Sequence, residues 1–481
     1  MARLLPLSLR APGSCFRALS LRAPGSCFRA LLVSLLLVAA LQLLYLGLLS
    51  AMHGRQQRLR YSRLFQGGGR LGAAPGAGAR GGEADSRDGG AGGSLTLGPG
   101  RLDPSGRYRL YRDVSRSPVS REAGDLELSL ATHSSLHNLH HLPGLARRWQ
   151  GPLAVAVFSG PGELGASLQL IHKLEGHCPC LRGRVTFTLV TPSGLPEKGV
   201  APEPGGGERQ EPGTRDPQGG EPPDPHPACR RALAQLRLYS RGRTNYALSA
   251  GPYPNNLLRN AARQALPSRH VLVIDVDMLP SAGLRPGFLR LLGGLTRGPE
   301  SRPGADRTVY VVPALEMRHT RRLPQHKAEL QQLYQVAEVR PFYAELCPRC
   351  QAPTNYSRWI NLPAAADATT STSSTGPVLQ VAYTREWTDP WEPFYISRNT
   401  VPPYDERFEQ YGFNRISQAC ELHVAGYTFA VLDNAFLIHK GFKLASEFHP
   451  QKDEENRRNR ILFRQFKQDL KLKYPDSPRW C

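Results

Sequence analysis

Negative charge is scarce in this sequence of 481 residues. Asp and Glu number 40 against 61 Lys and Arg, which gives a formal net charge of +21. The sequence lacks zinc-finger, RNP and helix-turn-helix signatures, so the positive charge does not predict nucleic-acid binding. An anionic membrane surface and anionic ligands, such as nucleotide-sugars and acidic glycans, remain as partners for this charge.

The N-terminal residues predict a membrane anchor. Residues 1–29 contain five arginines and no acid, and they include a tandem duplication, Leu9–Leu19 and Leu21–Leu31. Residues 30–51 are apolar over a length that spans the hydrocarbon core of about 30 Å. The preceding arginines favour a cytosolic tail, so we predict a single-pass type II signal-anchor. A cleaved secretory signal is the alternative, and both place the remaining chain in the lumen.

The composition predicts one large folded domain with flexible additions. The sequence contains 47 Gly and 42 Pro, which is high for a purely globular chain. Residues 52–106 are predicted to be a flexible stem, and residues 107–481 the lumenal domain. Within that domain, residues 197–227 and 364–376 have the composition of disordered insertions.

The sequence pattern at the start of the domain predicts a strand, a helix and a second strand. Leu153–Phe158 and Val185–Val190 are strand-like runs, and residues 163–173 between them look helical. This order predicts an α/β fold with a parallel sheet and helices outside it. Further predicted elements are helices at 228–240, 253–263, 325–338 and 461–472 and a strand at 308–313.

An Asp-x-Asp sequence follows the most sharply defined strand. Residues 271–274 are apolar and suit a strand buried on both faces, and Asp275 and Asp277 follow. Ligands bind at the carboxyl ends of strands in open α/β sheets. A divalent cation that joins these acids to a diphosphate would explain their position, whereas an ordinary loop is the alternative.

Two further segments hold candidate site residues. Residues 383–395 combine tryptophans with Asp389 and Glu392, a composition that suits a sugar site, although aromatic core packing is the alternative. His439 follows another apolar run and is a candidate metal ligand, or else an ordinary packing residue. Lys440 and Lys443 are candidates for a phosphate contact.

Seven cysteines follow the apolar run, and disulfides are their expected state in a secretory compartment. The odd number leaves at least one thiol outside intrachain pairs. Cys347 and Cys350 could instead form half of a zinc site, but no second pair at suitable spacing completes it. Asn355-Tyr-Ser357 is the single N-glycosylation sequon.

Several long segments together resemble a known family. They are Tyr253–Asn260, Val273–Met278, Cys350–Trp359, Asp389–Tyr395, Asp405–His423 and His439–Lys443. Their pattern resembles glycosyltransferase family 49, a domain of which also forms the C-terminal half of the LARGE enzymes. The resemblance covers the anchor and residues 107–481. The stem composition, the two insertions and the N-terminal duplication depart from the family pattern, which puts efficiency and acceptor choice in doubt more than chemistry.

The resemblance implies a GT-A fold, with a mainly parallel sheet flanked by helices, that binds a UDP-sugar through Asp-x-Asp and Mn²⁺. It implies inverting transfer of glucuronate from UDP-glucuronate to β-xylose in a β-1,4 linkage. The implied acceptor is an O-mannosyl glycan of dystroglycan, primed in this way for further polymer extension. The implied location is the Golgi membrane, where other transferases such as LARGE are candidate partners.

These considerations assign candidate roles. Asp277 and His439 are expected to ligate the metal, and Asp275 is expected to assist the metal and the ribose. Inversion requires a carboxylate that takes the proton of the attacking hydroxyl. The candidate bases are Asp389 and Glu392, which lie beside Trp391, with Glu421 as an alternative. The candidates for nucleotide or glucuronate binding are Asn256, Arg259, Lys440 and Lys443.

Two alternatives to glucuronyl transfer remain at this point. The same fold could transfer N-acetylglucosamine in β-1,3 linkage during poly-N-acetyllactosamine synthesis. A Golgi scaffold without catalysis is the non-enzymatic alternative, which the intact Asp-x-Asp and His439 motifs disfavour.

Overall fold

The computed structural model describes Gln42 and residues 97–115, 127–194, 226–240, 251–297, 307–364 and 379–481. The predicted tail, signal-anchor, most of the stem and most of both insertions therefore lie outside the described residues. Within the described ranges, no helix is both long enough and apolar enough to cross a membrane. The chain divides into two units, Met1–Ala91 and Gly92–Cys481, and both sheets belong to the second.

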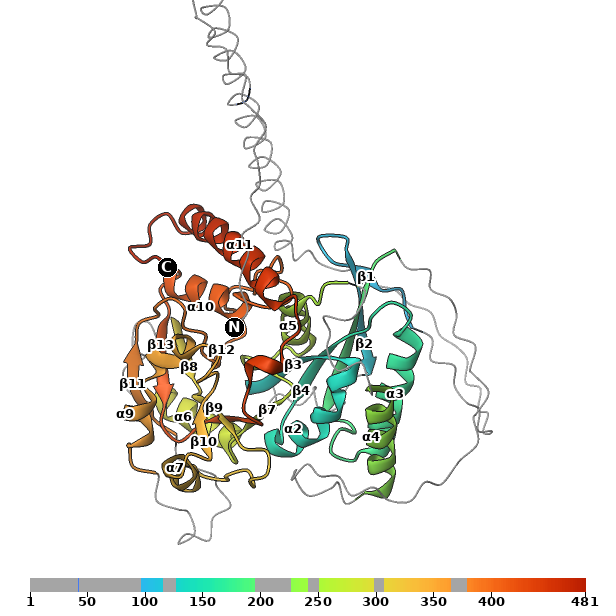
Figure 1. Ribbon diagram of the computed structural model, residues 1–481, viewed down its shortest axis with the longest axis horizontal. Helices are drawn as coiled ribbons and strands as arrows, with labels where there is room; N and C mark the ends of the chain where they lie inside the picture. The colour runs from blue at the N-terminus through green and yellow to red at the C-terminus, as the bar shows by residue number, and fades with distance from the viewer. Residues whose placement is uncertain are drawn as a thin grey trace, which may run out of the picture. The chain divides into compact units, whose positions relative to one another are not determined.

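A ten-stranded sheet runs through the second unit (Figure 1). In spatial order its strands are β1 (Arg101–Leu102), β2 (Tyr108–Ser115), β5 (Val185–Pro192), β4 (Leu153–Phe158), β3 (Leu128–Ser135), β6 (His270–Asp275), β12 (Tyr395–Arg398), β8 (Thr308–Val311), β13 (Thr428–Leu432) and β11 (Val381–Arg385). A second sheet has the order β10 (Val339–Pro341), β9 (Ala314–Met317), β14 (Leu437–Lys440) and β7 (Met278–Pro280).

The α/β class is confirmed, but the large sheet is mixed. Neighbouring strands are parallel along β5, β4, β3 and β6. Elsewhere the sheet is mixed, because β12 lies antiparallel between β6 and β8, whereas β8 and β13 are again parallel. β12 follows the tryptophan-rich segment, and no strand was predicted there.

The helices cover both sheets (Figure 1). They are α2 (Leu142–Trp149), α3 (Leu164–His177), α4 (Pro227–Ser240), α5 (Asn255–Ala265), α6 (Leu284–Arg297), α7 (Lys327–Gln335), α8 (Pro348–Gln351), α9 (Tyr356–Ile360), α10 (Asn414–Val424) and α11 (Lys452–Lys473). Short 3-10 helices are η3 (Leu136–His141), η6 (Ala352–Thr354) and η8 (Ala445–Glu447). The predicted helices are confirmed as α3, α4, α5, α7 and α11, with ends that differ by a few residues, and α11 begins nine residues before the predicted 461.

β6 is buried on both faces, as its sequence predicts. Val271 and Val273 pack with α5, whereas Leu272 and Ile274 belong to the core on the opposite face of the sheet. Successive side chains of a strand point to opposite faces. Asp275 therefore continues the row of Val271 and Val273, and it points to the face that α5 covers.

Disulfides join distant and neighbouring parts of the second unit. The pairs are Cys178–Cys229, Cys347–Cys350 and Cys420–Cys481, and Cys180 lies outside these three pairs. The prediction of disulfides is confirmed. The zinc alternative is wrong, because both sulfurs of Cys347 and Cys350 are used in one covalent bond.

Candidate active site

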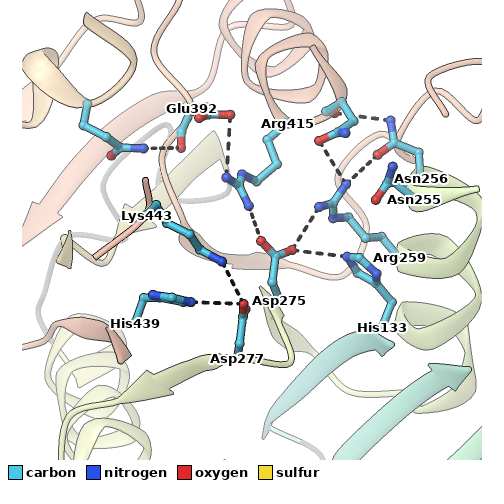
Figure 2. A network of polar contacts seen from close by, with 12 residues as sticks. His133, Asn255, Asn256, Arg259, Asp275, Asp277, Glu392, Arg415, His439 and Lys443 are labelled. Atoms are coloured by element: carbon cyan, nitrogen blue, oxygen red, sulfur yellow. Dashed lines mark hydrogen bonds and ion pairs between the residues drawn. The ribbon is translucent and has the colours of Figure 1, made fainter. Parts of the chain in front are cut away.

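Asp275 ends β6, and protein donors surround its carboxylate (Figure 2). β3 runs parallel to β6 in a register that places His133 opposite Asp275, and His133 Nε2 lies 3.2 Å from Asp275 Oδ1. Arg259 Nη2, from α5, lies 3.0 Å from the same oxygen. Arg415 Nη1, from α10, lies 2.5 Å from Oδ2. Asp275 therefore holds β6, α5 and α10 together through one carboxylate.

The charges around Asp275 keep it ionised. Burial alone would raise its pKa, but Arg415, His133 and Arg259 hold the pKa well below its ordinary value. Burial and Arg259 lower the pKa of His133, so its imidazole is neutral at pH 7. His133 Nδ1 lies 2.8 Å from the Tyr253 hydroxyl, which donates to it, while Nε2–H donates to Asp275. The oxygens of Asp275 are thus occupied by donors from the protein.

Asp277 has different neighbours, on the other side of Figure 2. Its Oδ2 lies 3.2 Å from His439 Nε2 and 3.3 Å from Lys443 Nζ. His439 Nδ1 lies 2.7 Å from the Gly441 carbonyl oxygen, which can only accept, so Nδ1 carries a proton and Nε2 is the nitrogen that faces Asp277. If the ring is neutral and a cation is bound, the lone pair of His439 Nε2 would be available to that cation, beside the carboxylate of Asp277. Two electron-pair donors converge at this point.

This pair fits a divalent cation. A carboxylate and an imidazole are common ligands for such ions, and a backbone carbonyl that fixes the imidazole tautomer is typical of metal sites. Burial would raise the pKa of Asp277, but Lys443 and His439 hold it below the ordinary range. Within the described part of the chain, no three His, Cys, Asp or Glu side chains form a ready metal cluster. Asp277 and His439 would therefore supply two ligands, with nucleotide oxygens and water as the others.

Two of the four candidate nucleotide-binding residues bind the aspartates directly, and a third binds one of these two. Lys443 and Arg259 join the network, each beside one of the two aspartates. Asn256 is fully buried behind Arg259: its Oδ1 accepts from Arg259 Nη1 at 3.0 Å, and its Nδ2 donates to the Asp405 carbonyl at 2.8 Å. Asn256 therefore positions Arg259. Lys440 is the last residue of β14, so its side chain points to the face opposite that of His439.

Of the candidate bases, Glu392 alone joins the network in Figure 2. Its Oε2 lies 3.6 Å from Arg415 Nη2, so one guanidinium stands between Glu392 and Asp275. Burial raises the pKa of Glu392, although Arg415 lowers it in part. Asp389 is exposed. Glu421 is buried under the C-terminal helix, where its Oε1 accepts from Lys473 Nζ at 2.6 Å and from the Tyr474 hydroxyl at 2.9 Å.

Sequence reasoning did not single out His133 or Arg415. His133 follows a run of apolar and small residues, Leu128–Thr132, and a polar residue at the end of a parallel strand is a usable signal. Arg415 lies within the segment Asp405–His423, but nothing local distinguishes it from other arginines. Its importance follows from the two carboxylates that it contacts, Asp275 and Glu392.

Comparison with known proteins gives the class of the protein. The family described as "Glycosyl-transferase for dystroglycan" matches residues 127–475, so the chain is a glycosyltransferase. It belongs to this family, and the resemblance to glycosyltransferase family 49 is confirmed.

Two named relatives cover most of the chain, and a third covers less than half of it. Beta-1,4-glucuronyltransferase 1 of Danio rerio is 47% identical over 94% of this chain and 97% of its own length. The Homo sapiens protein of the same name is 47% identical over 79% of this chain and 83% of its own. Xylosyl- and glucuronyltransferase LARGE1 of Homo sapiens is 30% identical over 46% of this chain and 27% of its own.

A solved structure, that of S. aureus TarS 1–349 in complex with UDP, aligns with 73% of this chain and 67% of its own. The TM-score is 0.31 and the sequence identity is 9%.

Proposed function

We propose that this glycosyltransferase moves glucuronate from UDP-glucuronate to a β-xylose acceptor and forms a β-1,4 linkage with inversion. The identity of 47% to relatives named beta-1,4-glucuronyltransferase 1, over 94% of the chain in one case, supports the donor and the linkage. The observation that carries the catalytic assignment is the convergence of Asp277 and His439 near β6, beside the Arg415–Glu392 pair. The finer fold assignment is of the GT-A type, supported by the parallel strands β5, β4, β3 and β6 and the acids that follow β6.

A divalent cation, which we propose to be Mn²⁺, would be held by Asp277 and His439. When bound, it supplies positive charge to the UDP leaving group. Lys443 adds a cation beside Asp277, and Arg259 adds one beside Asp275. These side chains bind and orient the anionic donor, with Asp275 keeping Arg259 and Arg415 in place.

The proposed base is Glu392. The acceptor hydroxyl oxygen bonds to C1 of glucuronate, the bond from C1 to the UDP oxygen breaks, and Glu392 takes the hydroxyl proton. UDP leaves with the bonding electron pair. A carboxyl group whose pKa is raised by burial is a stronger base than an exposed glutamate, while the opposite charge of Arg415 keeps enough of it ionised.

The biological setting is also a proposal. The family description and the resemblance support an acceptor on O-mannosyl glycans of dystroglycan, with the enzyme priming further extension by other transferases such as LARGE. The apolar run at 30–51 and the preceding arginines support a type II Golgi membrane protein with a lumenal domain.

A donor screen tests the proposed reaction. The full-length protein is incubated with a β-xyloside, Mn²⁺ and, in separate reactions, UDP-glucuronate, UDP-N-acetylglucosamine and UDP-glucose. We expect product only with UDP-glucuronate, and none after removal of divalent cations with EDTA until Mn²⁺ is returned. Turnover confined to UDP-N-acetylglucosamine would replace the glucuronyl assignment, and absence of turnover with every donor would favour the scaffold.

The sequon tests the lumenal placement. Asn355 caps the N-terminus of α9, and Ser357 in the first turn of that helix is exposed. We expect the protein from cells to shift in mass on treatment with an N-glycosidase, and the Asn355→Gln variant not to shift. An unshifted wild-type protein would place this segment outside the lumen or show that the sequon is unused. A protease-protection assay on intact vesicles separates those two results.

A further inference from the structure

The Cys347–Cys350 disulfide closes a four-residue ring that is hydrogen-bonded to the backbone of Glu392. Cys347 and Cys350 are only three positions apart. The carbonyl of Cys350 accepts a hydrogen bond of 3.0 Å from the backbone N–H of Glu392. The next residue, Gln351, is 2% exposed, and its Nε2 donates to the carbonyl of Glu392 at 3.1 Å. Both backbone polar groups of Glu392 are therefore fixed by this ring and its neighbour.

The other end of the ring is hydrogen-bonded to Tyr343. The backbone N–H of Cys347 donates to the carbonyl of Tyr343 at 2.9 Å. Tyr343 has a φ of 59°, a conformation that costs energy for a bulky residue and persists only where the surroundings impose it. Burial and Glu392 raise the pKa of its phenol, and Arg415 opposes the rise. The ring thus joins the backbones of Tyr343 and Glu392.

The residues around the ring form a rigid support. Trp391 is fully buried, and its Nε1 donates to Thr354 Oγ1 at 3.0 Å. Trp387 Nε1 donates in turn to the carbonyl of Trp391 at 2.8 Å. These bonds fix the residues before Glu392. The backbone N–H and carbonyl of Glu392 itself are bound by Cys350 and Gln351.

Global stability is a poor explanation for so short a ring. In the chain-entropy account, a disulfide stabilises by closing a loop in the unfolded chain, and the effect grows with loop length. Cys178–Cys229 spans 51 positions and Cys420–Cys481 spans 61, whereas Cys347–Cys350 spans three. The contacts of the short ring lead to Glu392 and Tyr343.

We propose that the Cys347–Cys350 disulfide is a positioning device for the carboxylate of Glu392. It fixes the backbone from which this side chain reaches Arg415 and the acceptor hydroxyl. The inference rests on the proposed function, in which Glu392 is the base. Loss of the ring slows proton removal from the acceptor and leaves donor binding at Asp277 and His439 unchanged.

The test compares two disulfide deletions in the full-length protein. In Cys347→Ser/Cys350→Ser we expect kcat for transfer to a β-xyloside to fall about 10- to 100-fold, the range for a misplaced catalytic group, with the KM for UDP-glucuronate within about twofold of wild type. The control is Cys178→Ser/Cys229→Ser, which opens a disulfide between α3 and α4. We expect the control to lower the Tm more and kcat less. Equal kcat in both variants would overturn the proposal.

A second variant tests the proposal even if Cys347→Ser/Cys350→Ser fails to fold, and a coupling measurement tests it where that variant folds. Gln351→Met removes the donor to the Glu392 carbonyl at similar volume, and we expect it to lower kcat in the same direction. In a Glu392→Gln background, loss of the ring is expected to cost less than about twofold further, because residues that act as a unit are not additive. A full, additive loss there would show that the ring acts elsewhere. Wild-type protein that does not use UDP-glucuronate would instead refute the proposed function.

Discussion

Replacement of Asp277, the proposed metal ligand, by Asn is expected to lower the rate of glucuronyl transfer by about 10³-fold or more, because a charged metal ligand is worth several kcal/mol to such a reaction. Asn keeps the size of Asp and one oxygen, but it loses the charge that pairs with His439 and Lys443. We expect the weakened binding to be visible as a higher Mn²⁺ concentration at half-maximal rate. Initial rates over a Mn²⁺ titration at saturating UDP-glucuronate measure both effects.

Asp275→Asn is the variant to compare with Asp277→Asn, because the two carboxylates have different partners and their loss should affect stability differently. Arg259 and Arg415 are 4% and 10% exposed, and the substitution leaves both without their shared carboxylate. Removal of one partner from such a buried pair costs about 3 kcal/mol in the free energy of unfolding. Asp277→Asn is expected to cost less, because Lys443 is 25% exposed and water can solvate it. Denaturant unfolding of both variants at pH 7 measures the difference.

The pH dependence of stability follows from the same contacts. The pKa of Asp275 is lowered in the folded protein, so its stabilising contribution is present above the ordinary pKa of a carboxyl group. The contribution is lost as the pH falls through the lowered value. The stability difference between wild type and Asp275→Asn should therefore shrink in acid. A difference that is constant from neutral to acidic pH would show that Asp275 does not act through its charge.

Local sequence pattern predicted the strand and the acids that follow it. A run of apolar residues at 271–274 could be buried on both faces, and the structure shows that alternate residues enter separate cores. The helix predicted at 253–263 is likewise present as α5, which begins at Asn255. The pattern could not predict that Asp275 binds donors of the protein whereas Asp277 faces the candidate metal site. That difference depends on α10, whose Arg415 lies 140 positions from Asp275.

The same limit applies to the candidate bases. Asp389 and Glu392 are three positions apart in one tryptophan-rich segment, and their sequence contexts are equivalent. The fold separates them, because Trp391 is buried against Thr354 while Asp389 stays exposed. Glu421 looked comparable in sequence, but its partners Lys473 and Tyr474 belong to α11 and the residue after it. Long-range packing therefore decides which candidate base lies in the site, and single-sequence patterns do not encode that packing.

Glu392→Gln is therefore expected to lower kcat by about 10²- to 10⁴-fold, the usual contribution of a general base, with the KM for UDP-glucuronate nearly unchanged. Asp389→Asn, on the exposed side of the same turn, is the matched control and should keep kcat within about twofold, as surface substitutions usually do. Burial raises the pKa of Glu392, so the wild-type rate should fall on acidification at a higher pH than for an ordinary glutamate. The residual rate of Glu392→Gln should lack that step. If Asp389→Asn instead removed the activity and Glu392→Gln kept it, Asp389 would be the base and Glu392 only a partner of Arg415.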